Sequence, residues 1–82
     1  MPEPKLVTLR QMLPGQKGKV IQVQGGYGLV NRLSALGIRP SKKITKISSM
    51  LMRGPVTIQS GHTRVAVGFG MANKIIVELE ES

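Results

Sequence analysis

The stretch that decides the fold is "GGYGLVNRLSALGIRP", residues 25–40, where two glycines lead into a segment with helical periodicity. Leu29, Leu33 and Leu36 are spaced i, i+4 and i+7, which places them on one face of a helix. A helix this short is not stable alone, so these leucines must pack against a sheet.

The end of the helix is also written in the sequence. Gly37 suits the position just past a helix, where a left-handed backbone is favourable only without a Cβ. Pro40 prevents the helix from continuing. Counting back from Gly37 places Leu33 and Ile38 at the two positions that touch in a Schellman cap. The stretch therefore predicts one capped helix of about eight residues.

The glycines before the helix have the outline of a phosphate-binding loop, but they do not complete it. Gly26 and Gly28 supply only the first half of a G-x-G-x-x-G fingerprint, because Asn31 stands where the third glycine belongs. The loop also lacks the lysine of a P-loop. We interpret these glycines as a tight strand-to-helix turn.

The length of 82 residues allows one domain, expected over 1–82 with a core at about 6–79. With no cysteine, the chain has neither a disulfide framework nor a thiolate metal site. We see no signal peptide, and the longest run without polar side chains, 65–72, is too short to span a membrane. The expected location is cytoplasmic.

The formal net charge is +8, and every charged residue between Pro4 and Val77 is Lys or Arg. The four acids lie near the two ends: Glu3, Glu78, Glu80 and Glu81. Such a basic body attracts nucleic acid, anionic lipid or an acidic protein surface. The alternative is a basic surface that only keeps the protein in solution.

The rest of the chain reads as short strands between turns. The predicted strands are "KVIQVQ" with Ile21 and Val23 on one face, "KITKISSMLM" with a bulge or bend, "VTIQ", "RVAVG", and "KIIVELE" with Ile75, Val77 and Leu79 inward. "SGHT" predicts a hairpin turn and "FGMAN" a single helical turn. About five short strands and one helix predict a mainly β fold, a small closed or nearly closed barrel.

The chain has few residues that are suited to catalysis or metal binding. The chain has no Asp, and its single histidine has no evident orienting partner, so we predict no enzyme activity. The only candidate metal ligands are His62, Glu78 and Glu80, which could meet across strands or across a subunit contact. The alternative is that His62 is a solvated residue at a hairpin tip.

Nucleic-acid binding is the main competitor to protein binding. The charge favours it, and "LPGQKGKVIQVQGG" has the strand opening of small ribosome-associated barrels. Tyr27 and Phe69 are the only aromatic residues, so a stacking platform for single strands is nearly absent. A binder of RNA or DNA backbone stays open as the alternative function.

Together, "LPGQKGKVIQVQGG", "RLSALGIRP", "GPVTI" and "VAVGFGMANKIIVE" resemble the FeoA family of small ferrous iron transport proteins. The resemblance runs from about residue 6 to 78 and implies an SH3-like β-barrel with one short helix. It departs from the family at three positions. Asn31 and Phe69 stand where a basic residue is frequent, and Ser41 replaces a frequent glycine.

The resemblance implies a non-enzymatic accessory role on FeoB, the membrane ferrous iron transporter with a GTPase-like cytoplasmic part. It also implies an association with transition-metal binding, and self-association stays open. For the docking surface we predict a basic group with two aromatic anchors, namely Arg32, Arg39, Lys42, Lys43, Tyr27 and Phe69. The alternative for Phe69 is packing in the core.

Overall fold

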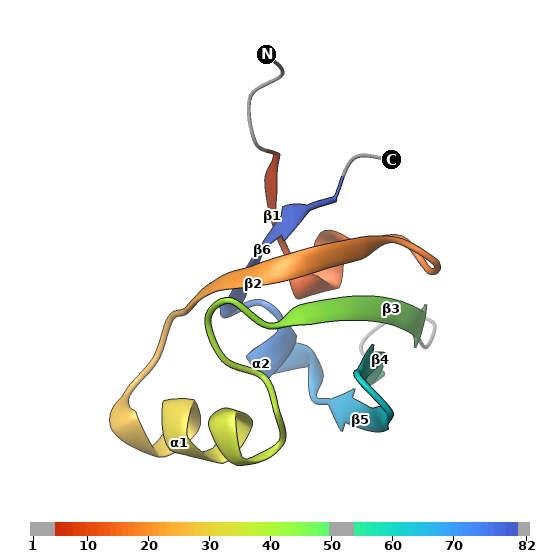
Figure 1. Cartoon of the computed structure of the whole chain (residues 1–82). Helices are drawn as coiled ribbons and strands as arrows, with labels where there is room; N and C mark the ends of the chain where they lie inside the picture. The colour runs from red at the N-terminus through yellow and green to blue at the C-terminus, as the bar shows by residue number, and fades with distance from the viewer. Residues whose placement is uncertain (1–4, 50–53, 81–82) are drawn as a thin grey trace.

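In the computed structural model, which describes residues 5–49 and 54–80, one antiparallel sheet curls around a single core (Figure 1). Its strands follow the order β1-β6-β2-β3-β4-β5. The strands are β1 (Leu6–Thr8), β2 (Lys17–Val23), β3 (Lys43–Ser49), β4 (Val56–Ser60), β5 (Thr63–Val67) and β6 (Ile75–Leu79). The helical elements are a 3-10 turn η1 (Leu9–Gln11), α1 (Tyr27–Ala35) and α2 (Phe69–Ala72).

The predicted fold class is confirmed, a mainly β domain built as a small SH3-like barrel. The structure has six strands where about five were predicted, because the N-terminal stretch forms the short edge strand β1 before η1. The predicted helical turn at "FGMAN" is α2. Met50 and Met52, at the end of the predicted strand "KITKISSMLM", lie outside the described residues.

The cap of α1 matches the prediction in detail. The amide of Ile38 donates to the carbonyl of Leu33 at 2.8 Å, and the amide of Gly37 donates to Ser34 at 3.0 Å. Gly37 has φ +90°, and both Leu33 and Ile38 are buried. These two bonds define a Schellman motif.

Two predictions about faces were wrong. Leu36 is 43% exposed, because it is the C-cap of α1 and the chain turns away there, which leaves Leu33 as the one fully buried residue of the helix. Ile21 is exposed because Gly18 and Val20 face inward and strand alternation places Ile21 on the outer face; the bulge between Val20 and Gln22 then shifts the phase, so that Val23 is partly buried and separates from Ile21.

Gly18 brings β2 and β6 into close contact. A Cβ at Gly18 would lie 2.3 Å from Cγ1 of Val77 and 2.8 Å from the carbonyl oxygen of Glu78. Because Gly18 has no side chain, β2 can lie this close to β6 at that point. Lys17 and Lys19, on either side of Gly18, are therefore on a strand that lies close to β6.

Candidate protein-interaction surface

Two turns of the same type precede β2 and β3, the strands that carry the exposed lysines Lys17, Lys19 and Lys43. In the first, Leu13–Gln16, the amide of Gln16 donates to Leu13 at 3.0 Å, and Gly15 has φ +91°. In the second, Arg39–Lys42, the amide of Lys42 donates to Arg39 at 3.1 Å, and Ser41 has φ +77°. Each turn has proline second and a positive φ third, the pattern of a type II turn.

The second turn explains why glycine is frequent at position 41 in the family that the sequence resembles. A type II turn needs a left-handed residue at its third position, where any side chain adds strain. Ser41 accepts this strain while its amide donates to the carbonyl of Val20 at 2.8 Å. The amide of Val20 in turn donates to Lys42 at 2.8 Å, so β2 fixes the turn from both sides.

We use the term helix-end cluster for the exposed residues Arg32, Arg39, Lys42 and Lys43, which lie on α1, on the second turn and at the start of β3. Arg39, Lys42 and Lys43 follow the last residue of α1, Ala35, by four, seven and eight residues. Tyr27, at the first position of α1, is 89% exposed.

Phe69 occupies a different part of the molecule. It is half-buried on α2, which packs near η1, and the guanidinium carbon of Arg10 lies 4.7 Å from the centre of its ring. Figure 1 shows α1 at one end of the molecule and α2 behind the strands. Arg10 therefore lies over one face of the Phe69 ring and makes a cation–π contact with it.

The buried residue that the sequence reading missed is Lys46, which is only 2% exposed. Its ammonium Nζ donates to the carbonyls of Leu9 at 3.3 Å and Arg10 at 3.1 Å, and also to that of Met12. Burial lowers the pKa of the Lys46 ammonium. The lysine thereby ties η1 to β3, with all three of its N–H donors used.

A signal for Lys46 was present in the sequence. Ile44 faces the core, and strand alternation then turns Lys46 to the same side. The predicted irregularity follows directly after it, because the pairing of β3 with β4 shifts between Lys46 and Ser48 and makes Ile47 the extra residue.

The candidate metal ligands do not form a site in the described part of the chain. His62 lies in the two-residue turn between β4 and β5, where Ser60 pairs with Thr63, as the predicted hairpin requires. Glu78 and Glu80 line a hollow with lysines. Among residues 5–49 and 54–80, no three His, Cys, Asp or Glu side chains come together in a way that could hold a metal ion.

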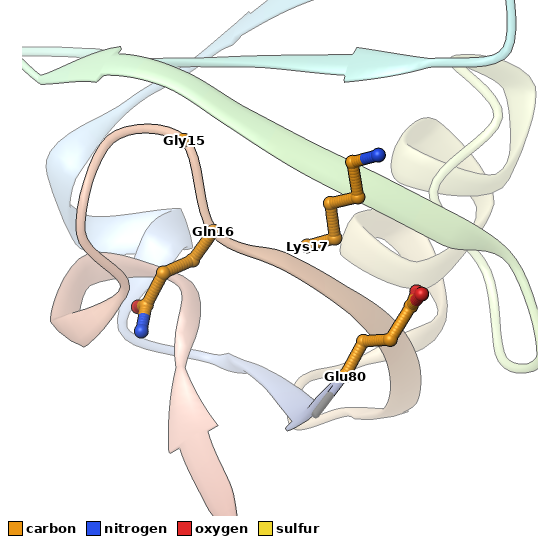
Figure 2. A pocket seen from close by; sticks show the side chains of 4 residues that line it. All are labelled: Gly15, Gln16, Lys17 and Glu80. Carbon is orange, nitrogen blue, oxygen red and sulfur yellow. The ribbon is translucent and has the colours of Figure 1, made fainter. Parts of the chain in front are cut away.

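The sheet has a hollowed outer face that involves Lys17, Lys19 and Lys43. Three adjoining hollows of about 380, 350 and 270 Å³ all have Glu80 in their walls. Figure 2 shows the side chains of Lys17 and Glu80 extending in the same direction, while Gln16 points the other way. The side-chain oxygen of Gln16 accepts from the amide of Leu13 at 2.8 Å, so this residue belongs to the first turn.

The site features define a class of protein: a small basic SH3-like barrel whose shallow hollows and exposed cations suit the binding of another molecule. The model of the FeoA domain matches residues 7–79. The chain therefore belongs to the FeoA domain family.

Individual relatives agree with this assignment. A Methanocaldococcus jannaschii protein named as an Fe(2+) transport protein A is 34% identical over 64 residues, which cover 78% of this chain and 76% of the relative. A crystal structure of an iron uptake regulatory protein (FeoA) is 34% identical with a TM-score of 0.87, and the match covers 93% of this chain and all of that one.

The same fold occurs inside a larger protein. A manganese-dependent transcriptional repressor matches 98% of this chain with a TM-score of 0.85, but only 45% of its own length is covered. At 17% identity this likeness shows the fold alone. No helix among the described residues is long and apolar enough to cross a membrane.

Proposed function

We propose that the protein is an accessory module of ferrous iron uptake that acts by binding, without catalysis, on the cytoplasmic part of a FeoB-type membrane transporter. Membership of the FeoA domain family and the name of the archaeal relative support the link to iron transport. The protein would then work in the cytoplasm, at the inner face of the membrane.

The observation that carries the proposal is the helix-end cluster. Its four cations are exposed, and a type II turn and a Schellman cap hold the backbone that presents them. Among the described residues, Glu78 and Glu80 are the only acids; Glu78 lies near the C-terminal end of β6 and Glu80 directly follows that strand. A rigid basic surface of this kind suits an acidic protein partner.

Tyr27 is the first aromatic anchor of the proposal. It is the most exposed of the large apolar residues in the described part of the chain, and it stands on the same helix as Arg32. Aromatic residues and arginine dominate the binding energy of many interfaces. Phe69 stays the second proposed anchor; it is partly buried on α2, with the guanidinium of Arg10 over its ring.

The proposal is tested by charge reversal at the second turn. The double variant Arg39→Glu with Lys42→Glu should bind the transporter's purified cytoplasmic region about tenfold more weakly in biolayer interferometry, while its circular dichroism stays unchanged. Lys74→Glu, a single charge reversal on an exposed residue before β6, is the control and should bind like the wild type.

Two results would contradict the proposal. One is equal binding by the wild type and the double variant. The other is stronger binding to RNA or DNA than to the transporter region, with an affinity that falls steeply as salt rises, because that slope measures counterion release from a phosphate backbone. The second result would favour the nucleic-acid function.

A further inference from the structure

On the outer face of β6, β2 and β3, two lysines on neighbouring strands lie opposite each other. Lys19 of β2 is the direct cross-strand partner of Lys43 of β3, and on its other side Lys19 pairs with Glu78 of β6. Directly opposed side chains on neighbouring strands have Cβ atoms about 5 Å apart. Like charges at this distance destabilise a sheet.

In the neighbouring row of the sheet, the lysine does not face a second lysine. Lys17 pairs with Thr45, and the amide of Glu80 donates to the carbonyl of Lys17 at 2.9 Å, so an acid stands beside this lysine. Glu78 stands in the same way beside Lys19. Each acid has one lysine neighbour, and the positive charge left over is that of Lys43.

The surface around this excess charge is hollowed. One hollow of about 350 Å³ has Lys17, Lys43 and Thr45 in its wall, and one of about 270 Å³ has Lys19, Lys43 and Glu78. Lys43 therefore stands between two hollows, with a lysine across each. Ammonium groups and a threonine hydroxyl are suitable donors for a carboxylate.

We propose that this outer lysine face, formed by Lys17, Lys19, Lys43 and Thr45, binds an acidic peptide segment of a partner protein, with one carboxylate between Lys19 and Lys43. The inference rests on the proposed function in that it names the chemistry of the partner. The peptide carboxylate would relieve the repulsion between the two lysines, because Glu78 lies beside Lys19 and the charge of Lys43 is left over.

One observation favours a carboxylate segment over a nucleic acid, while Glu78 and Glu80, which border the hollows, repel either ligand. The two aromatic residues of the chain, Tyr27 and Phe69, are absent from the hollow walls, so bases would find no stacking surface there.

The test uses the full chain labelled with nitrogen-15 and titrated with hexaglutamate peptide blocked at both ends. The expected result is saturable shifts of backbone amide signals at residues 17–19 and 43–45. In the double variant Lys19→Gln with Lys43→Gln the peptide should bind about tenfold more weakly, a loss of about 1.4 kcal/mol. The melting temperature of this variant should rise by about 2 °C, because the like-charge pair is gone.

Lys74→Gln removes one lysine charge away from this face and should change neither quantity. The proposal is overturned if the double variant binds the peptide as Lys74→Gln does, or if the shifts gather at Arg32 and Arg39 instead. It is also overturned if a six-residue oligothymidylate binds the same face more tightly than the peptide. The peptide titration does not contain the transporter, so it tests the lysine face by itself. If the peptide binds this face but the transporter region does not bind the protein, only the proposed function fails. If the peptide does not bind this face, the inference fails.

Discussion

Strand β3 carries two lysines three residues apart, and the fold treats them in opposite ways. Lys46 points inward, and three backbone carbonyls around η1 accept hydrogen bonds from its ammonium. Lys43 points outward, and the residue opposite it on β2 is another lysine. The donors of the first lysine are used within the fold, whereas the second faces a like charge, and we propose that it is left for a partner.

The two lysines show how a charge that stabilises a basic protein differs from a charge that is available for binding. A lysine whose donors are all satisfied inside the molecule is evidence for structure. A lysine that faces a like charge beside a hollow is evidence for binding, because the fold gains nothing from it. The formal charge of +8 alone does not separate the two cases.

The largest effect is expected from Lys46→Gln, which removes the ammonium that is hydrogen-bonded within the fold. The shorter amide cannot reach three carbonyls, and the buried oxygens of Leu9 and Met12 lose their donor. We expect the free energy of unfolding to fall by about 2 kcal/mol, measured by urea denaturation. The same substitution at Lys43 is the matched control, and an equal loss in both variants would show that Lys46 has no special role.

The next effect comes from the turn that leads into Lys43. Ser41→Gly should raise the free energy of unfolding by about 1 kcal/mol, because glycine adopts the left-handed conformation without strain. Gly15→Ser, in the matching turn before β2, should lower it by a similar amount, since space for a Cβ is open there and only the backbone cost remains. Thermal denaturation measures both, and changes of the same sign would refute the shared turn type.

A pH titration sharpens the contrast between the two lysines. Burial lowers the pKa of Lys46 in the folded protein below its ordinary value of 10.5. Between these two pKa values the unfolded chain binds more protons, so the free energy of unfolding gains a contribution that rises with pH. The difference in stability between the wild type and Lys46→Gln should widen as pH approaches 10.5 and stay flat below the folded pKa. A difference that narrows over that range would contradict the burial of the charge.

The smallest effect is expected from Lys43→Gln, and it has the opposite sign to that of Lys46→Gln. Removing one member of the Lys19–Lys43 pair should raise the free energy of unfolding by about 0.5 kcal/mol. Because salt screens exposed charges, the gain should shrink in 1 M sodium chloride, where the screening length is about 3 Å. A destabilised variant would mean that Lys43 makes a favourable contact in the fold.

The sequence predicted those parts of the fold that depend on local chemistry. The spacing of Leu33, Gly37 and Ile38 was enough to define the end of α1, since a Schellman cap is set by neighbouring residues. The "SGHT" hairpin and the bulge in β3 followed from strand alternation in the same way.

The rest depends on which strands become neighbours. The opposition of Lys19 and Lys43 is visible only once the register of β2 and β3 is known, because these residues lie far apart in the sequence. The carbonyls that surround Lys46 likewise come from a segment more than thirty residues earlier in the chain. The helix-end cluster could be named from sequence, but the outer lysine face could not.

The central claim is that Lys43 is kept for a partner and Lys46 for the fold. It is tested most directly by measuring the affinity of the Lys43→Gln variant for the transporter's cytoplasmic region at a temperature where the variant is fully folded. The account predicts weaker binding, by about fivefold, together with a melting temperature at or above that of the wild type. Unchanged affinity, or weaker binding accompanied by a lower melting temperature, would contradict it.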